Sequence, residues 1–421
     1  MKIAVIGSGI SGLSSAILLS QDHDITLIES DTRFGGHANT VDVMYDKKSI
    51  PVDTGFIVYN ELNYPNLLSF FKWLNIDTIS SDMSFAVSAR DGDLEYSGSL
   101  KGLFAQKKNY FNLNFYKILK DIIIFFIFGY KYAFQIKENE SLSEYVKRCK
   151  FSDEFVKDHL IPMSSAIWSC PEKEIFNFPA KNLLTFFKNH QLINFIVRPK
   201  WRTVKNGSKQ YVEKVLEKLK LNKKNRLLLN TKIENITLEN NKVKIKFKNK
   251  IEYFDKIIMA THPNQTLGLI KNLDKKSFDI LSKFKYQKNV VYLHSDTLLM
   301  PKNKKTWSSW NYLSTEKTKQ KSSVTYWMNT LQRLNTSLNI FVTLNPYQKP
   351  KKDLTHKVLS YEHPIFNLET NIAQKEISSI QGINNVFHTG AWTNYGFHED
   401  GIKSAVNVVK KMNVQIPWDL N

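Results

Sequence analysis

Residues 1–12 read MKIAVIGSGISG and join an apolar strand to a glycine-rich turn that opens a helix. The run Ile3–Ile6 is typical of a buried parallel strand. Gly7, Gly9 and Gly12 follow with G-x-G-x-x-G spacing. The first glycine permits a tight turn, the second lets a pyrophosphate approach the backbone, and the third lets the helix pack closely on the strand. The pattern predicts a dinucleotide-binding turn, against the plainer alternative of a turn that binds nothing.

A second predicted strand supports the dinucleotide interpretation. Asp24–Ile28 is largely apolar and is followed by Glu29. An acid about 20 residues beyond the glycines can accept hydrogen bonds from the hydroxyls of an adenosine ribose. The helix after the turn offers free N–H groups and a positive dipole end to the phosphates. We therefore expect a dinucleotide at the carboxyl end of the first two strands.

Length and composition indicate a globular protein of two or more domains. The chain has 421 residues, of which 42% are hydrophobic and 23% charged. Its two cysteines, Cys149 and Cys170, form no C-x-x-C motif, which argues against a disulfide framework and thiolate metal sites. Met1 leads directly into the first strand and leaves no room for a signal peptide. A cytoplasmic location is therefore expected, with peripheral contact at the inner face of the membrane as an extension.

The formal net charge of +20 raises the question of an anionic partner. No nucleic-acid-binding motif accompanies this charge and the lysines are spread along the chain, so no nucleic acid is expected. An anionic membrane surface is the favoured partner if the basic clusters have one. The apolar run Ile122–Phe128, flanked by Lys117, Lys120 and Lys131, is too short to span a membrane. It is typical of a buried helix or of a helix lying in a membrane interface.

The predicted nucleotide-binding sheet receives strands from the beginning, middle and end of the chain. The middle supplies Leu227–Leu229 and Lys256–Ala260, and the end supplies Val386–His388 before a helix expected to start near Gly401. Aromatic-rich helices are predicted over Leu100–Ile196. The expected fold class is α/β, with a Rossmann-like, discontinuously threaded nucleotide-binding domain (1–84, 200–283 and 383–421) and an α+β substrate domain of mixed sheet and helices (85–199 and 284–382).

These motifs resemble the FAD-dependent superfamily of amine oxidases, protoporphyrinogen oxidases and phytoene desaturases over essentially the whole chain. The resemblance rests on residues 7–12, Glu29, Gly35-Gly36, Ile233, Gly390 and the GFHEDG motif at 396–401. Within that superfamily the chain looks like a bacterial group of predicted NAD/FAD-binding oxidoreductases, on the stretches GGHANT, VDTGFIVYN, SDMSFAVS, PMSSAIWS, SWNY, YEHPIF and GFHEDGIKSA. Genes of that group often lie beside cyclopropane-fatty-acid-synthase-type methyltransferases. The resemblance thus implies an amine-oxidase-like fold, FAD and a methyltransferase partner.

The resemblance also implies a non-covalent FAD site, because no cysteine lies near the closing motif. Gly7, Gly9, Ser11 and Gly12 would hold the pyrophosphate, and Glu29 would hold the ribose. The other residues implied to contact FAD are Arg33, Gly35, Gly36, His37, Thr54, Gly55, Phe56, Ile233 (through its backbone, to the adenine), Gly390, Glu399, Asp400, Gly401 and Ile402. A helix N-terminus near the flavin would stabilise the negative charge that reduction places there.

Several departures argue against an amine substrate. Asp31 and His37 stand where amine oxidases commonly carry arginine, and GFHEDG is one residue longer than the amine-oxidase version. Phe397 falls at one wall of the aromatic cage that binds amines, and no second wall is matched.

Lys288 and two histidines are the candidate catalytic residues. The segment Gln287–Tyr292 resembles a strand whose lysine is bridged by water to flavin N5; the alternative for Lys288 is a surface lysine. His398 and His363 lie in motifs that the resemblance brings near the flavin, where they act as acid or base or simply hydrogen-bond cofactor or backbone. His37 and His262 are weaker candidates. No metal is expected, since no histidine pair has ligand spacing with a third partner.

The sequence predicts an FAD oxidoreductase that takes a hydride from a carbon of an apolar substrate. The methyltransferase association and the aromatic second domain favour a lipid acyl chain. The alternatives are a flavin amine oxidase, a carotenoid-type desaturase, or a non-catalytic flavin-binding partner of the methyltransferase.

Overall fold

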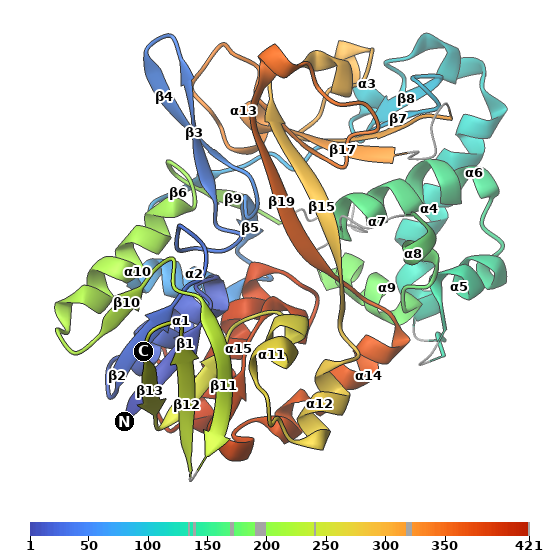
Figure 1. Cartoon of the computed structure of the whole chain (residues 1–421). Coiled ribbons are helices and arrows are strands. Elements are labelled where there is room, and N and C mark those ends of the chain that lie inside the picture. The colour runs from blue at the N-terminus through green and yellow to red at the C-terminus, as the bar shows by residue number, and fades with distance from the viewer. Residues whose placement is uncertain are drawn as a thin grey trace.

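The computed structural model describes residues 1–133, 135–137, 140–168, 172–189, 199–239, 241–316 and 322–419. Cys170 and residues 190–196 of the predicted helical region lie outside the described residues. Figure 1 shows a lower part that carries both termini, a second large sheet above it and a group of helices at the side.

A five-stranded parallel sheet forms the centre of the lower part. Its order is β10-β2-β1-β14-β20, so β1 lies in the middle, and all neighbouring strands are parallel. The strands are β1 (Lys2–Ile6), β2 (Asp24–Ile28), β10 (Arg226–Leu228), β14 (Lys256–Met259) and β20 (Val386–His388). The prediction that the beginning, middle and end of the chain share one sheet is confirmed.

Both faces of this sheet are covered, which explains the unbroken apolar run of β1. Ile3 and Val5 pack against helices on one face, and Ala4 and Ile6 pack against a three-stranded antiparallel sheet on the other. The helices are α1 (Ile10–Leu19), α2 (Pro65–Trp73), α10 (Lys209–Leu221) and α15 (His398–Lys411). The antiparallel strands are β11 (Ile233–Glu239), β12 (Lys242–Phe247) and β13 (Ile251–Phe254).

A seven-stranded mixed sheet combines two distant segments of the chain. Its order is β19-β15-β18-β17-β16-β7-β8, and only the β16–β7 pair is parallel. The strands are β7 (Phe85–Ala89), β8 (Leu94–Ser97), β15 (Lys285–His294), β16 (Trp310–Ser314), β17 (Ser322–Trp327), β18 (Phe341–Leu344) and β19 (Thr355–Ile365). The domain boundaries themselves stay a prediction.

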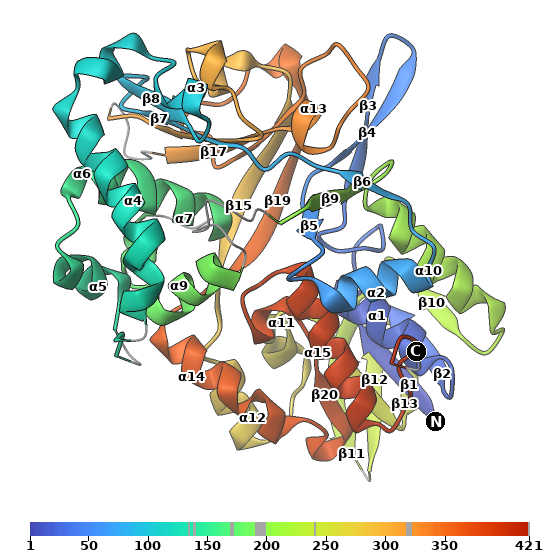
Figure 2. The ribbon, with the colours of Figure 1, turned by 180° about the vertical axis from the view of Figure 1, so that it is seen from behind.

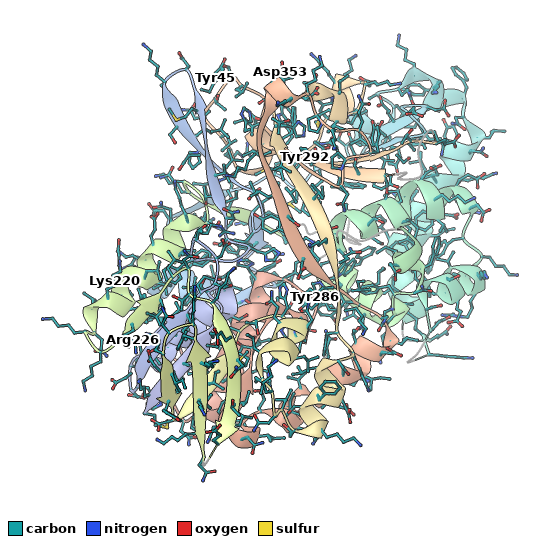
Figure 3. All side chains as sticks on the ribbon, in the orientation of Figure 1. Tyr45, Lys220, Arg226, Tyr286, Tyr292 and Asp353 are labelled. Atoms are coloured by element: carbon teal, nitrogen blue, oxygen red, sulfur yellow. The ribbon has the colours of Figure 1, made fainter. Side chains whose placement is uncertain are left out.

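The β15–β19 ribbon connects the two sheets in space. Its two strands are paired from Lys285↔Ile365 to His294↔Thr355. Figure 3 shows Tyr292 on β15 beside the upper sheet and Tyr286 of the same strand near the lower part. The lower end of this ribbon therefore reaches the carboxyl edge of the parallel sheet.

Helices flank the upper sheet, as Figure 2 shows from behind, and most of them share a core rich in buried phenylalanine. They are α3 (Leu100–Leu103), the 3-10 turn η1 (Lys107–Phe111), α4 (Leu113–Ala133), α5 (Leu142–Cys149), α6 (Asp153–Phe155), the π turn η2 (Val156–Leu160), α7 (Ile161–Trp168), α8 (Glu172–Phe176) and α9 (Ala180–Asn189). Among the described residues, no helix is long and apolar enough to cross a membrane.

Smaller elements complete the fold. They are the hairpin β3 (Thr40–Tyr45) and β4 (Lys48–Asp53), the sheet of β5 (Val58–Asn60), β6 (Thr78–Ser80) and β9 (Trp201–Val204), and helices α11 (Pro263–Leu269), α12 (Lys275–Leu281), α13 (Met328–Leu331) and α14 (Leu368–Glu376). The last helix, α15, begins at His398, earlier than the Gly401 expected from the sequence. Its start is set by Asp400, whose carboxylate accepts the N–H of Phe397 at 2.9 Å.

Gly12→Ala should destabilise the protein, because the added Cβ would lie 1.9 Å from the carbonyl oxygen of Gly7. We expect the free energy of unfolding to fall by about 1–3 kcal/mol, measured by urea denaturation. Gly268→Ala is the matched control, since Gly268 lies within α11 and has nothing within 4 Å of its Cβ position. The control should leave the stability unchanged or raise it by up to about 1 kcal/mol; equal losses in both variants would contradict the packing role of Gly12.

Candidate functional site

The glycine turn lies at the carboxyl ends of three adjacent strands. The N–H of Gly7 donates to the carbonyl of Ile28 at 2.9 Å, which ties the end of β1 to β2. Gly7 has a φ of +93°, and a Cβ there would lie 2.8 Å from the carbonyl oxygen of Ala260, directly after β14. The turn therefore requires glycine at this position both for its conformation and for its contact.

The space beside Gly9 is open. Nothing lies within 4 Å of its Cβ position, although a Cβ at either neighbouring motif glycine would collide with backbone. Gly9 is the N-cap of α1, and no side chain of the described residues caps this helix. Its first N–H groups can therefore bind a ligand, and a phosphate oxygen is the acceptor such a helix end favours. This open space fits the pyrophosphate of a dinucleotide.

Glu29 is held firmly at the end of β2. Its Oε2 accepts the N–H and the hydroxyl of Ser8 at 2.9 and 2.7 Å, and its Oε1 accepts the N–H of Asp31 at 2.9 Å. The carbonyl of Glu29 accepts the N–H of Thr231 at 2.8 Å, so Ile233 at the start of β11 follows a segment beside the acid. Ser8 could not be predicted as part of the site, because the middle position of G-x-G tolerates many residues and gives no signal.

The loop after β2 folds across the glycine turn. A Cβ at Gly36 would lie 2.9 Å from the Cα of Gly9, and Gly35 donates its N–H to the carbonyl of Ser8 at 3.1 Å. Arg33 directs its guanidinium to the loop itself, donating to the carbonyls of Gly36 and Ala38 at 2.6 and 3.2 Å. Arg33 therefore shapes this edge of the site through the loop backbone.

The closing motif brings the N-terminus of α15 against the N-terminus of α1. A Cβ at Gly401 would lie 2.7 Å from Ile10 and 2.9 Å from the hydroxyl of Ser11, so the two helices meet there without an intervening side chain. Ile402 is fully buried beside them. Gly390, at the end of β20, donates its N–H to the hydroxyl of Ser404 at 2.9 Å. Two positive helix ends thus converge near the open space beside Gly9.

The two acids of the closing motif occupy different environments. The carboxylate of Glu399 accepts the backbone N–H groups of Asn66 and Leu67 at 3.2 and 2.9 Å, so it binds the N-terminus of α2. Burial raises the pKa of Glu399, against the lowering effect of these hydrogen bonds. Burial also raises the pKa of Asp400 to about 7. The side chain of Glu399 is therefore engaged in joining α15 to α2.

Aromatic and histidine rings from three parts of the chain gather next to the turn. His37 lies 4.9 Å from Tyr361 and 5.3 Å from His363, measured between ring centroids. His398 stacks on Phe56 with centroids 3.7 Å apart. The Nε2 atom of His37 is buried and has no hydrogen-bond partner among the described residues. An orphaned polar atom of this kind points to a missing ligand.

The four histidines of this region are neutral at pH 7. Burial lowers the pKa of His37 and of His262 to about 4 and that of His363 to about 3. Burial also lowers the pKa of His398 well below its ordinary value. The pKa of each histidine is further lowered by the charge of another of the four histidines, so the four rings form one electrostatic cluster. Neutral imidazoles can accept a proton or a hydrogen bond.

Hydrogen bonds from the β15–β19 ribbon and the β4 end fix this cluster. The amide of Asn289 donates to Nδ1 of His363 at 2.6 Å, which leaves the ring proton on Nε2. Thr54 and Asn39 both contact the hydroxyl of Tyr361, at 2.7 and 2.8 Å. Gly55 permits the close approach of this segment, since a Cβ there would lie 2.3 Å from the carbonyl oxygen of His37. Asn289 and Tyr361 carry no sequence signal that marks them as site residues.

The structure does not bring Lys288 into the histidine cluster. Lys288 is exposed, whereas its neighbour Asn289 is buried. Successive side chains of a strand point to opposite faces, so Lys288 lies on the other face of the ribbon from Asn289 and its partner His363. Its role at the flavin stays a prediction, beside the alternative of a surface lysine. Among the described residues, no group of His, Cys, Asp and Glu could hold a metal ion.

The sequence matches one protein family over most of its length. The family model described as flavin containing amine oxidoreductase covers residues 10–413. The chain belongs to this family. As a flavin-containing amine oxidoreductase it is an FAD-dependent enzyme, and the geometry at Gly9 and Glu29 fits that cofactor. A search among curated proteins finds no match.

Solved structures share the fold of this amine oxidoreductase at low identity. A CLA-producing fatty acid isomerase from P. acnes is 14% identical with a TM-score of 0.65, over 97% of this chain and 98% of the isomerase. Cyclohexylamine oxidase from Brevibacterium oxydans IH-35A is 13% identical with a TM-score of 0.66, over 98% and 99% of the two chains. Putrescine oxidase bound to putrescine is 12% identical with a TM-score of 0.65, over 99% and 100%.

Gly9→Val should abolish FAD binding while the apoprotein keeps its stability, because the valine would fill space that no protein atom occupies. FAD content is measured from the flavin absorbance of the purified protein, and stability from thermal unfolding after FAD removal. Acid treatment should release intact FAD from the wild-type protein, as expected for a non-covalent cofactor. Wild-type FAD occupancy in the variant would contradict the pyrophosphate assignment.

The stability of the amine oxidoreductase should depend on pH through the buried histidines. Between about pH 3 and about pH 6.5, His363 is protonated in the unfolded state and neutral in the folded state, so it makes the free energy of unfolding fall as the pH is lowered. His363→Gln should flatten this slope relative to the wild type by up to about 1.4 kcal/mol per pH unit. Urea denaturation at several pH values measures it.

The wild type must be compared with the variant, because two buried acids change the free energy of unfolding with pH in the direction opposite to His363. Burial raises the pKa of Asp53 to about 6 and that of Asp400 to about 7, so their protonation stabilises the folded state on acidification. Their contribution is the same in both proteins and cancels in the difference. Identical slopes for wild type and His363→Gln would show that His363 is not held neutral.

Proposed function

We propose that this FAD oxidoreductase takes a hydride from a carbon of an apolar substrate, a lipid acyl chain modified by a partner methyltransferase. The observation that carries the proposal is a wall of aromatic side chains beside the N-terminus of α15. The wall is formed by Phe186, Phe366, Tyr395 and Phe397, and it continues into the phenylalanine core of helices α4 to α9. Such a wall binds hydrocarbon and excludes water.

The packing within this wall favours an acyl chain over an amine. Phe397 and Phe186 are nearly parallel, with centroids 5.0 Å apart, and Tyr395 lies 5.8 Å from Phe186. Stacked rings at this distance are in contact, so an amine cannot enter between Phe397 and Phe186. Phe366 closes the wall from the end of β19, where its ring would lie 3.2 Å from a Cβ at Gly396. The result is a continuous apolar surface.

The neutral histidines supply the proton chemistry of the proposed reaction. When bound, FAD accepts the two electrons of the hydride. Loss of a hydride from one carbon of an acyl chain and a proton from the next creates a double bond, so an adjacent base is needed. His37 can accept this proton on its unpartnered Nε2, because burial keeps the ring neutral. The stacked ring of Tyr361 and the tilted ring of His363 keep the ring of His37 in place.

Two resemblances support the substrate class and the partner. The fold is shared with a fatty acid isomerase, which shows that this architecture can act on a fatty acid. The methyltransferase partner rests on the sequence resemblance to a bacterial group whose genes often lie beside such enzymes. The runner-up function is an amine oxidase, which the family description and the putrescine and cyclohexylamine oxidases favour.

Anaerobic mixing of the FAD-loaded protein with candidate substrates tests the reaction. Phospholipids with unsaturated, methylated or cyclopropane acyl chains, presented in mixed micelles, should bleach the visible flavin absorbance. Putrescine and cyclohexylamine should not. Bleaching by amines alone would establish the runner-up, and bleaching by neither class would contradict the proposed reaction.

His37→Asn separates catalysis from cofactor binding in the same assay. The variant should retain FAD and slow substrate-dependent bleaching by about 100-fold, the usual contribution of a general base. His159→Asn is the matched control, since His159 is also buried with a pKa lowered to about 4, but it packs in the helical part between Tyr96 and Phe155. Equal rates for His37→Asn and the wild type would remove His37 from the mechanism.

A further inference from the structure

Exposed apolar side chains gather on one surface formed by α3, η1 and the start of α4. Leu100 is 87% exposed, Phe111 91% and Leu113 79%, and Tyr110 and Tyr116 are about half-exposed. We call these five residues the α3–α4 face. Soluble surfaces rarely expose so many large apolar side chains together, and such a patch marks an interaction site. We propose that the α3–α4 face docks reversibly on an anionic membrane.

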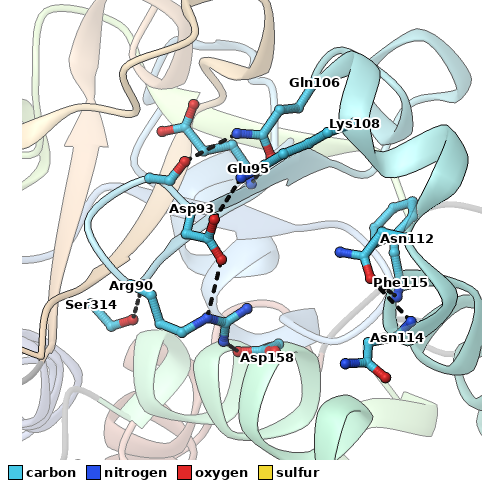
Figure 4. A network of polar contacts seen from close by, with 11 residues as sticks. Arg90, Asp93, Glu95, Gln106, Lys108, Asn112, Asn114, Phe115, Asp158 and Ser314 are labelled. Carbon is cyan, nitrogen blue, oxygen red and sulfur yellow. Dashed lines mark hydrogen bonds and ion pairs between the residues drawn. The ribbon is translucent and has the colours of Figure 1, made fainter.

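A network of polar contacts orders the segment that carries the α3–α4 face (Figure 4). Gln106 accepts the N–H of Glu95 at 2.9 Å, and Lys108 pairs with Asp93 at 2.6 Å. Asn112 accepts the N–H of Asn114 at 3.0 Å and so organises the start of α4. The exposure of the face is therefore a property of an ordered segment.

The burial within η1 is the reverse of the usual pattern. Asn109 is fully buried and donates its side-chain amide to the carbonyls of Glu95 and Leu103 at 3.1 and 3.3 Å. Phe111, two residues later, is almost fully exposed. A segment that buries its amide and exposes its phenylalanine loses hydrophobic stabilisation in water, which contact with lipid would restore.

Helix α4 extends the face. Phe115, Ile118 and Phe125 point into the core with at most 1% exposure, whereas Ile123 and Ile127 are 49% and 57% exposed on the outer side. Residues on a helix are rotated by about 100° from one to the next, which places these two isoleucines on the same side as the α3–α4 face. Phe126, by contrast, packs inward against the phenylalanine core, so only part of the apolar run Ile122–Phe128 is available to lipid.

The charges around this face select an anionic surface. Lys101, Lys107 and Lys120 make no ion pair with any described residue, while Lys117 pairs with Glu154 at 2.9 Å. Aromatic and leucine side chains with lysines beside them are the composition of surfaces that insert into the headgroup region of anionic lipids. A second copy of the chain is disfavoured as the occupant, because a symmetric dimer would bring the same unpaired lysines together.

The position of the face suits a docked enzyme. Figure 2 shows α3 and α4 at the end of the molecule that lies away from α1, α10 and the two termini. The same helical group includes α9, which carries Phe186 of the aromatic wall. Docking through this face would leave the nucleotide-binding part in water. The inference stands on the surface itself and does not depend on the proposed substrate.

Flotation of the FAD-loaded full chain with vesicles tests the inference. The wild type should float with phosphatidylglycerol vesicles at low salt, and its affinity should fall at least about tenfold in high salt or on neutral phosphatidylcholine vesicles. Phe111→Asp with Leu113→Asp should reduce binding at least about tenfold, and Lys101→Glu with Lys107→Glu should do the same. All four side chains are exposed, so FAD content and melting temperature should stay at wild-type values.

Leu221→Asp is the matched control, since Leu221 is 82% exposed at the end of α10, on the nucleotide-binding part. It should float as the wild type does. The inference would be overturned if the wild type failed to float at low salt or if the Phe111/Leu113 variant bound as the wild type does. It would also be overturned if the wild type were a dimer that this variant dissociates. Flavin bleaching by a water-soluble short-chain acyl substrate is measured in parallel, so that a failure of docking is distinguished from a failure of the proposed reaction.

Discussion

The close contact between the N-termini of α1 and α15 is the constraint on which the rest of the site depends. It exists because Gly401 has no side chain where Ile10 and Ser11 of α1 approach. Gly12 likewise lets α1 approach the carbonyl of Gly7 at the end of β1. Two helix dipoles therefore direct their positive ends to the same region, which suits both a pyrophosphate and the charge of a reduced flavin.

The β15–β19 ribbon supplies the second half of the site from a different part of the chain. Its pairing places His363, Tyr361 and Asn289 together at the lower end, where they meet His37 from the loop after β2. The two strands of the ribbon belong to the seven-stranded sheet, so that sheet fixes the position of these side chains. This arrangement gives a cluster of neutral rings beside the cofactor-binding edge.

One group of helices carries both the buried aromatic wall and the exposed α3–α4 face. The wall at Phe186 and Phe397 is inside the molecule, beside the histidine cluster, and the same group of helices carries the exposed α3–α4 face. Helix α4 takes part in both, because its inner side packs in the phenylalanine core and its outer side bears isoleucine and lysine. The exposed apolar face and the buried aromatic wall are therefore carried by one group of helices.

The sequence alone determined the nucleotide-binding edge and the family. The strand, turn and helix at residues 1–19 are contiguous, and the spacing itself predicts the close contacts at Gly7 and Gly12 and the open space at Gly9, so local reasoning was sufficient. Only the tertiary structure decided which side chains complete the site. Ser8 binds Glu29, and Asn289 rather than Lys288 faces His363. A strand alternates its side chains with a period of two, so this choice depends on register and on the neighbouring strand.

The tertiary structure likewise decided the contacts and the exposure of residues with strong sequence signals. Glu399 belongs to the closing motif, but its carboxylate binds the N-terminus of α2, because that helix end lies next to it in space. Phe111 and Leu113 are ordinary core residues by composition, yet both are exposed. Burial is set by which element covers a side chain, and distant parts of the chain make that contact, so no local pattern could predict it.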